Sequence, residues 1–151
     1  MPAKVDEVNR EVFRRLGDGR KSFSSIADEL GVAENTVRSR VGKLMDEGML
    51  SFQGLVDPDK IPSIQMAYLG MKFSTLDLAR KADQMLALKG VVSAAVVTGR
   101  YDMIVLLQLN VEEDFSILNF FKNELVKIDE IKSIETFVVY KSRKLMVPYL
   151  I

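Results

Sequence analysis

Apolar residues repeat at helical spacing in two short segments between positions 22 and 50. The first segment is Ser24–Leu30 and the second is Glu34–Glu47. In each, apolar residues return every three or four positions, as on one side of an α-helix. Gly31 lies between them, and because glycine adopts a positive φ at little cost, it ends the first helix. Two helices joined by a tight turn of this kind are typical of a helix-turn-helix.

The second helix has two distinct faces. At about 100° per residue, Val37, Val41, Leu44 and Met45 fall on one stripe and are expected to be buried. The opposite face carries amide, hydroxyl and cationic groups without a carboxylate, and such groups hydrogen-bond to phosphates and base edges. A solvated helix of a small bundle is the alternative. We predict DNA contacts from Asn35, Thr36, Arg38, Ser39, Arg40 and Lys43, together with Arg20 and Lys21 ahead of the motif.

The cations of this helix have different expected roles. Lys43 is expected to contact a phosphate, whereas Arg38 suits either a phosphate or a base. Arg40 lies nearer the buried edge of the helix, so an ion pair with a carboxylate is an alternative role for it.

The flanking segments extend the motif into a head of three helices. Val5–Leu16 repeats apolar residues as a first helix, and Met49–Val56 is expected to form a short wing-like or linking strand. Asp57, Pro58 and Pro62 then mark a turn-rich hinge. We therefore place a helix-turn-helix DNA-binding domain at residues 1–50 and a linking strand and hinge at residues 51–63.

Strands and helices alternate over residues 64–151, the expected sensing and dimerisation domain. Apolar runs predict strands at Ile64–Phe73, Val91–Thr98, Met103–Leu109 and Ile131–Tyr140, and helices from Ser74 or Thr75 to Leu88 and at Val111–Lys127. Leu86 and Leu118 are expected to face inward. This βαββαβ order is that of a ferredoxin-like sheet. The predicted fold class is α+β, with a tri-helical (winged) helix-turn-helix head before a ferredoxin-like sheet domain.

One face of such a sheet has no helices. Phe52 and the tail Leu145–Ile151 add more apolar surface than a small domain is expected to expose. We therefore expect a homodimer that forms through the sheets.

Composition narrows the possible chemistry. The 151 residues are 48% hydrophobic and carry no net formal charge, so attraction to DNA has to come from the local arrangement of basic residues. The chain has no histidine and no cysteine, which removes the commonest general base and all thiolate chemistry. Neither a long apolar run nor a signal-peptide core is present. We expect a cytoplasmic protein with no membrane association, no cofactor and no metal.

The chain from Val5 to Tyr140 resembles the leucine-responsive regulator (Lrp/AsnC) family of transcription factors. The likeness rests on DGRKSFSSIADELGVAENTVRSRVGKLMDEGML, on VDPDKI and on VVTGRYDMIVLLQL, in this order. The resemblance implies a prokaryotic regulator whose sheet domains dimerise, and often assemble further, while paired heads contact successive major grooves of double-stranded DNA. It also implies that a small molecule, commonly an amino acid, binds the sheet domains near subunit contacts.

Carried onto this chain, the resemblance implies an effector site in one loop of the sheet domain. Its residues are Thr98, Gly99, Arg100, Tyr101 and Asp102, with Thr136 on the last strand as an addition. The chemistry is consistent, because N–H groups near Gly99 can receive a carboxylate and Asp102 can accept from an ammonium group. An ordinary hairpin turn is the alternative.

Position 33 departs from the family. Serine is frequent there and would cap the recognition helix, whereas Ala33 cannot accept from the first-turn N–H groups, at a cost of about 1 kcal/mol. Two other functions stay open. Relatives with this architecture include siroheme decarboxylases, although the absence of histidine weakens an enzymatic role. The other alternative is a sensing or assembly module that does not bind DNA.

Overall fold

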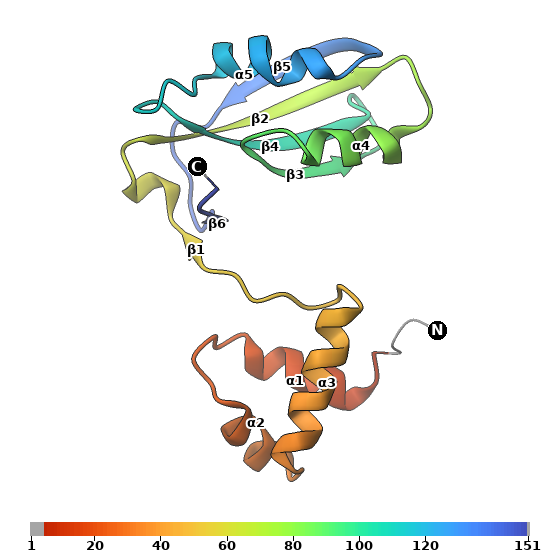
Figure 1. Cartoon of the computed structure of the whole chain (residues 1–151), viewed down its shortest axis with the longest axis vertical. Helices are drawn as coiled ribbons and strands as arrows, with labels where there is room; N and C mark the ends of the chain where they lie inside the picture. The colour runs from red at the N-terminus through yellow and green to blue at the C-terminus, as the bar shows by residue number, and fades with distance from the viewer. Residues whose placement is uncertain (1–4, 151) are drawn as a thin grey trace. The chain divides into compact units, whose positions relative to one another are not determined.

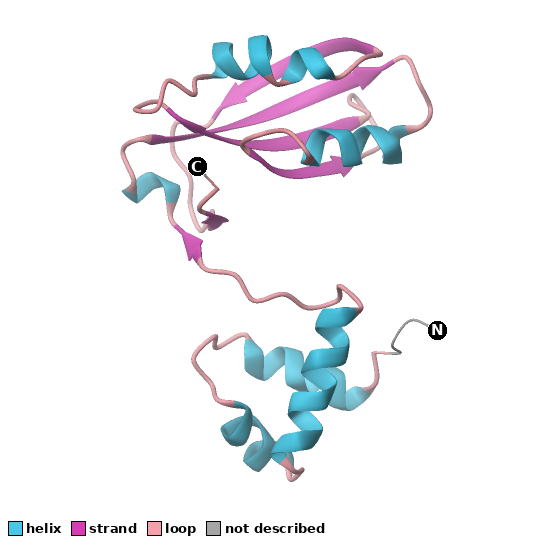
Figure 2. Cartoon of the chain, viewed as in Figure 1, coloured by secondary structure: helices cyan, strands magenta, loops and turns pink. Residues whose placement is uncertain are grey.

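The computed structural model describes residues 5–150, which divide into two compact units. One unit ends at Gln53 and the other begins at Gly54. Among the described residues, the regular elements of the first unit are helices, whereas the second combines helices with a four-stranded and a two-stranded sheet (Figures 1 and 2). The predicted α+β fold is confirmed.

Three helices build the first unit, hereafter the head. They are α1 (Glu7–Leu16), α2 (Phe23–Leu30) and α3 (Glu34–Asp46). The Ser22 hydroxyl accepts a hydrogen bond from the first turn of α2, and Gly31 ends that helix at a φ of 65°. The helix-turn-helix that the sequence predicts is therefore present.

The head closes around a small apolar core. Val12, Ile26, Ala27, Val37 and Val41 are at most 2% exposed. Met45 was expected to be buried but is 43% exposed, because it falls at the edge of the apolar stripe. Val5 is also exposed, because it precedes Asp6, whose carboxylate caps α1.

The expected wing does not form in the described part of the head. The strand predicted at Met49–Val56 is only β1 (Leu55–Val56), which lies in the second unit and pairs there with β6 (Val147–Pro148). It is therefore a strand of the second unit and not a wing of the head. At the other end of the motif, α3 begins after Ala33 without a side-chain cap, as the sequence predicts.

The second unit, hereafter the sheet domain, contains an antiparallel sheet in the order β3-β4-β2-β5. Its strands are β2 (Ile64–Phe73), β3 (Val91–Val96), β4 (Met103–Asn110) and β5 (Ile131–Val138), with α4 (Leu78–Leu86) and α5 (Ile117–Asn123) between them in the chain (Figure 1). A 3-10 turn at Pro58–Lys60 precedes β2. Strand, helix and strand repeat twice, which confirms the predicted ferredoxin-like topology.

The main core lies between this sheet and its two helices. Met85 of α4 and Phe120 of α5 are fully buried against alternate residues of the two central strands, namely Leu69, Met71, Met103, Val105, Leu107 and Leu109. Because neighbours along a strand point to opposite faces, Tyr68, Gly70 and Ile104 belong to the other face. The sheet thus has a helix-covered face and a helix-free face.

The C-terminal tail covers part of the helix-free face. Val147 is 1% exposed and packs with Ile64, Met66 and Leu106. The sequence prediction that the tail only adds exposed apolar surface is therefore wrong for Val147. It is confirmed for Met146, Tyr149 and Leu150, which stay exposed, while Ile151 lies outside the described residues.

A buried amide fastens the tail to the sheet. Gln108 of β4 is fully buried, and its side chain donates to the Pro148 carbonyl at 3.1 Å and accepts from the Leu150 N–H at 2.8 Å. Because a buried amide without partners is costly, these bonds account for a polar residue within the apolar sheet.

Both helices of the sheet domain are shorter than the sequence predicts. α4 begins after Asp77, whose carboxylate caps it, rather than after Ser74 or Thr75. α5 begins after Ser116, because Phe115 pairs back to Asn110 and holds the preceding residues in a turn.

The ends of these elements also differ in detail. A 3-10 turn, Leu125–Lys127, follows α5, and β3 and β5 end at Val96 and Val138, two residues before their predicted ends. Leu86 and Leu118, expected to face inward, are 49% and 56% exposed. They lie on shorter helices whose buried apolar residues are Met85 and Phe120.

Lys81 of α4 is fully buried, and its ammonium group reaches two carboxylates ahead of β5. It pairs with Asp129 and, at 2.9 Å, with Glu130. The hydrogen bond from Lys81 lowers the pKa of Asp129 below its usual 3.8, and the bond to Asp129 raises the pKa of Lys81 above its usual 10.5. The pair therefore ties α4 to the start of β5 across a wide pH range.

We expect Lys81→Met to reduce the acid sensitivity of the sheet domain. A lowered carboxyl pKa contributes stability that is present above about pH 4 and is lost as the pH falls through the folded value. The raised ammonium pKa contributes below about pH 10 and is lost at higher pH. Between pH 7 and pH 3 the melting temperature should fall less steeply in Lys81→Met than in wild type. Lys122→Met, on the exposed side of α5, is the charge-matched control, and identical slopes for Lys81→Met and wild type would contradict the assignment.

Candidate nucleic-acid interface and effector site

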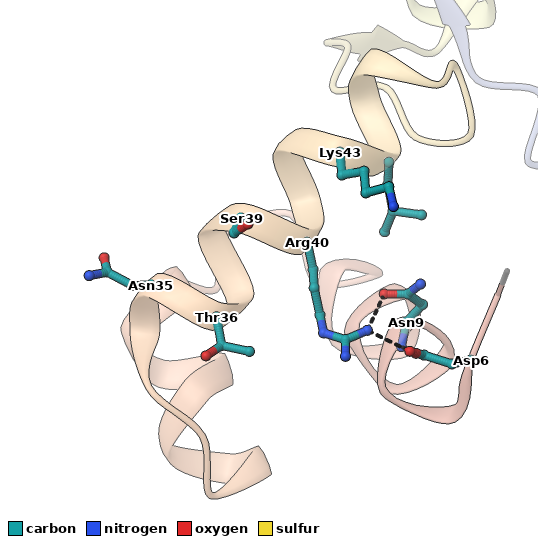
Figure 3. Close-up of a pocket in the computed structure, with 8 residues that line it drawn as sticks. Asp6, Asn9, Asn35, Thr36, Ser39, Arg40 and Lys43 are labelled. Atoms are coloured by element: carbon teal, nitrogen blue, oxygen red, sulfur yellow. Dashed lines mark hydrogen bonds and ion pairs between the residues drawn. The ribbon is translucent and has the colours of Figure 1, made fainter. Parts of the chain in front are cut away.

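Three uncharged polar side chains project from the first half of α3. Asn35, Thr36 and Ser39 are exposed, and Figure 3 shows Asn35 directed away from the other helices. Hydroxyl and amide groups at the N-terminal half of a recognition helix are those that read base edges in a major groove. This part of the predicted interface is therefore available for contact.

Arg38 lies on one flank of this face. Its guanidinium pairs with Glu34 at 2.5 Å and lies 5.4 Å over the ring of Phe23 in α2. The arginine side chain is still 61% exposed. A surface pair at this helical spacing contributes only about 0.3–0.5 kcal/mol, so a phosphate or base can replace Glu34 as its partner.

Arg40 lies on the other flank, where the alternative of an ion pair with a carboxylate is confirmed. Its Nη1 is 2.7 Å from Oδ2 of Asp6 and 3.1 Å from Oδ1 of Asn9 (Figure 3). The bond from Arg40 is the main cause that lowers the pKa of Asp6. Neither Asp6 nor Asn9 was indicated by the sequence, because no periodicity links α1 to a residue 34 or 31 positions away.

A cavity of about 690 Å³ opens between this flank of α3 and the start of α1. Its lining consists of Asp6, Asn9, Asn35, Thr36, Ser39, Arg40, Lys43 and Leu44 (Figure 3). Lys43 is 68% exposed and 4.0 Å from Glu47. Apart from Arg38, the predicted DNA contacts of α3 therefore meet around one concave surface.

The two cations ahead of the motif lie elsewhere. Lys21 pairs with Glu29 of α2 at 2.6 Å, and Arg20 is exposed in the turn before α2. Neither lines the cavity. Their assignment as DNA contacts stays a prediction.

The loop between β3 and β4 folds back across the helix-free face. Tyr101 lies against Gly70 of β2, and its hydroxyl donates to Glu135 of β5. Arg100 pairs with the same Glu135 carboxylate at 2.8 Å. Because Gly70 and Glu135 are partners in the β2–β5 register, the missing side chain at position 70 is what lets the tyrosine ring reach across. The hydrogen bond to Glu135 raises the pKa of Tyr101.

Asp102 has a structural role in the same loop. Its carboxylate accepts from the Phe73 N–H at 2.9 Å and from Lys72 at 3.1 Å, and its own N–H donates to the Met71 carbonyl. The Phe73 N–H is the main cause that lowers its pKa, followed by Lys72. Both carboxylate oxygens are thus engaged in holding β4 to the end of β2.

The remaining predicted effector residues are only partly brought together. Thr98 and Gly99 are exposed in the loop, with Gly99 at a φ of 123°. Thr136 follows Glu135 on β5, so its side chain points to the opposite face, away from Tyr101. Glu135 and Gly70 were missed by the sequence analysis. The signal for Gly70 was a lone glycine inside a strand, which often marks the close approach of another group.

The two units correspond to the two domains of a transcription regulator, a helix-turn-helix head and a ligand-binding domain, as comparison with known families shows. Residues 14–51 match the model of a winged helix-turn-helix DNA-binding domain, and residues 66–148 match the Lrp/AsnC ligand binding domain. The chain therefore belongs to the Lrp/AsnC family of transcriptional regulators, as the resemblance implied.

Two relatives that are transcriptional regulators align with this chain over most of both lengths. An uncharacterised HTH-type transcriptional regulator of Pyrococcus horikoshii is 30% identical over 143 residues, covering 93% of this chain and 89% of the relative. The HTH-type transcriptional regulator FL11 of Pyrococcus abyssi is 26% identical over 146 residues, covering 95% of each. Both relatives carry the names of transcriptional regulators.

Solved structures share the fold over nearly the whole chain. E. coli AsnC superposes with a TM-score of 0.69 at 23% identity, covering 95% of this chain and 97% of its own. The feast or famine regulatory protein of M. tuberculosis, complexed with L-methionine, gives 0.67 at 19% identity, covering 96% and 100%. Within residues 5–150, no helix combines the length and apolar character needed to cross a bilayer.

Proposed function

We propose that this Lrp/AsnC regulator acts in the cytoplasm as a sequence-specific DNA-binding homodimer whose state an amino acid modulates. In this proposal α3 of each head enters a major groove, and the effector binds at the loop between β3 and β4. Two heads related by a two-fold axis require half-sites about one helical turn, or a multiple of it, apart.

The observation that carries the DNA-reading proposal is the polar face of α3. Asn35, Thr36 and Ser39 are exposed on it, and Arg40 and Lys43 add positive charge around the adjoining cavity. With zero net charge on the chain, non-specific attraction is weak, so the arrangement of these donors has to supply most of the affinity.

Fluorescence anisotropy with two labelled duplexes tests this function. One duplex comes from the region upstream of the coding sequence and the other has the same composition in scrambled order. The logarithm of affinity should fall linearly with the logarithm of salt concentration, and the upstream duplex should bind roughly 10³-fold more tightly. Equal affinity for both duplexes would refute sequence-specific reading, and no binding to either would refute DNA binding.

The effector proposal rests on two opposite charges that are held side by side. Arg100 is 76% exposed and Glu135 is 41% exposed, so a zwitterion can replace the ion pair between them. The guanidinium suits the carboxylate of an amino acid, and Glu135 suits its ammonium group. Glu135 is a better acceptor than Asp102, whose oxygens bond to Phe73 and Lys72. The bound L-methionine in the related M. tuberculosis and Neisseria meningitidis regulators supports this ligand class.

We expect one or more amino acids to raise the melting temperature of wild type and to have no effect on Gly70→Ala. A Cβ at position 70 would lie 2.7 Å from the Tyr101 ring, so the ring must move and its bond to Glu135 breaks. A ligand at a hundred times its Kd stabilises by about 2.7 kcal/mol. All twenty amino acids are screened by thermal shift, with Gly54→Ala as the control, because a Cβ at position 54 has no atom within 4 Å. A full ligand shift in a folded Gly70→Ala protein would place the effector elsewhere.

The homodimer proposal rests on the helix-free face and the open edge of β5. Phe137 is 43% exposed there, opposite the half-buried Tyr68 of β2. Among the described strands β5 pairs only with β2, so its outer edge presents free backbone groups to a partner. Light scattering at micromolar concentration should give at least two chains per particle. A monomer under those conditions would contradict the proposal.

A further inference from the structure

The cavity beside α3 contains a contact that DNA reading does not require. Nη1 of Arg40 donates to Asp6 at 2.7 Å and to Asn9 at 3.1 Å. A guanidinium has five N–H donors, and Nη1 supplies two of them. Within residues 5–150 the Nε and Nη2 groups therefore remain as donors, while the positive charge is balanced by the carboxylate of Asp6.

The rest of the lining suits a phosphate group. The hydroxyls of Thr36 and Ser39, the amide of Asn35 and the ammonium of Lys43 are all hydrogen-bond donors, and they surround the cavity together with Arg40. Asp6 contributes the carboxylate of this lining. A phosphate here would meet a donor set typical of DNA backbone contacts, with one negative charge opposing it.

We propose that this cavity receives one backbone phosphate of bound DNA, with Arg40 as its main ligand, and that Asp6 is an internal competitor that occupies Arg40 in the free head. The inference rests on the proposed entry of α3 into the groove and adds a device that limits its affinity. Asp6 opposes binding in two ways, because it holds the guanidinium and repels the phosphate.

The exposure of the pair makes such an exchange feasible. The side chains of Arg40 and Asp6 are 33% and 46% exposed, so water reaches the pair and separating it costs little. The planar guanidinium binds the two oxygens of a phosphate as readily as those of a carboxylate. Its interaction with Arg40 also lowers the pKa of Asp6, so the competing charge is present at neutral pH.

One substitution separates the competing role of Asp6 from its helix-capping role. Oδ1 of Asp6 accepts from the Asn9 N–H at 2.8 Å and so caps α1. Asparagine and serine cap helices about as well as aspartate. Asp6→Asn and Asp6→Ser therefore remove the charge and keep the cap, and circular dichroism melting checks that the head still folds.

Anisotropy with the upstream and scrambled duplexes then gives a double-mutant cycle. Asp6→Asn should bind both duplexes roughly 3–10-fold more tightly near 0.1 M salt, and the salt dependence should steepen because the charge of Arg40 is then no longer balanced by a carboxylate. In the Asp6→Asn background, Arg40→Gln should abolish that gain. In the wild-type background, where Asp6 already competes for Arg40, Arg40→Gln should change the affinity by a smaller factor. Asp83→Asn, exposed on α4, makes the same change in net charge and should leave affinity unaltered.

Each other outcome overturns the inference. Affinity that is unchanged or weaker in both Asp6 variants shows that Asp6 does not compete. If the gain in affinity persists when Arg40→Gln is added, it arises from long-range charge and not from the release of Arg40. If the gain is confined to the upstream duplex, Arg40 contacts a base and not a phosphate. If wild type binds neither duplex, the proposed function fails and this inference with it. Wild-type binding without a gain in the Asp6 variants refutes the inference alone.

Discussion

Ser39→Glu is expected to weaken binding to the upstream duplex at least 100-fold without unfolding the head. Ser39 lies midway along the outward face of α3 and lines the cavity. A carboxylate there would face phosphates and base acceptors, and a like-charge contact in an interface costs several kcal/mol, of which about 2.7 kcal/mol is already a factor of 100. Anisotropy measures the loss, and because glutamate is a good helix former, the melting temperature should stay within a few degrees of wild type.

Two controls separate charge from shape at this position. Ser39→Ala removes the hydroxyl only and should weaken binding by no more than about 10-fold, in line with the loss of one hydrogen bond. Asn123→Glu adds the same charge to the exposed end of α5 in the sheet domain and should leave affinity unchanged. Wild-type affinity in a folded Ser39→Glu protein would show that this face of α3 does not meet DNA.

Gly90→Ala is expected to destabilise the sheet domain by roughly 3–5 kcal/mol or to prevent its folding. Gly90 has a φ of 81°, and a Cβ there would lie 2.5 Å from the Gln108 carbonyl oxygen and 2.6 Å from the Phe115 ring. The Gln108 N–H also donates to the Gly90 carbonyl at 2.7 Å, so the two backbones cannot separate without breaking the start of the β3–β4 pairing. Urea unfolding followed by circular dichroism measures the loss.

Gly99→Ala is the matched comparison for this prediction. Gly99 also has a positive φ, 123°, but no atom lies within 4 Å of the position that its Cβ would take. It should therefore show only the backbone strain of a left-handed residue, about 1–2 kcal/mol. An equal loss of unfolding free energy in Gly90→Ala and Gly99→Ala would mean that the close approach of Gln108 and Phe115 to Gly90 contributes nothing to the effect.

The elements set by local pattern were predictable from the chain. The apolar period of α3 predicted the burial of Val37 and Val41, because a helix places every third or fourth residue on one side whatever packs against it. The strand bounds predicted for β2, β3, β4 and β5 from their apolar runs also hold to within two residues at each end. Errors arose at the helix ends of the sheet domain, where Asp77 and Ser116 are the caps and several polar residues competed for that role.

Among the residues of the candidate sites, those within one local segment were predictable and those paired with distant segments were not. The polar face of α3 was predictable because its members lie within one helix, whereas the assignment of the loop 98–102 to an effector site rests on the resemblance and stays a prediction. Asp6 and Glu135 were not predictable. The first meets Arg40 across 34 positions and the second meets Tyr101 across 34 positions, and nothing local in the sequence carries information about such pairs.

The sequence by itself thus determined that this protein has a helix-turn-helix with an outward polar helix, followed by a βαββαβ domain, because both follow from periodicity, turns and caps within short stretches. Only the tertiary structure decided which charged side chains already have partners within the chain. It paired Asp102 with the backbone of β2, Glu135 with Tyr101 and Asp6 with Arg40. The physical reason is that a side chain's partners depend on the three-dimensional register of distant segments, whereas its helix or strand depends mainly on its neighbours.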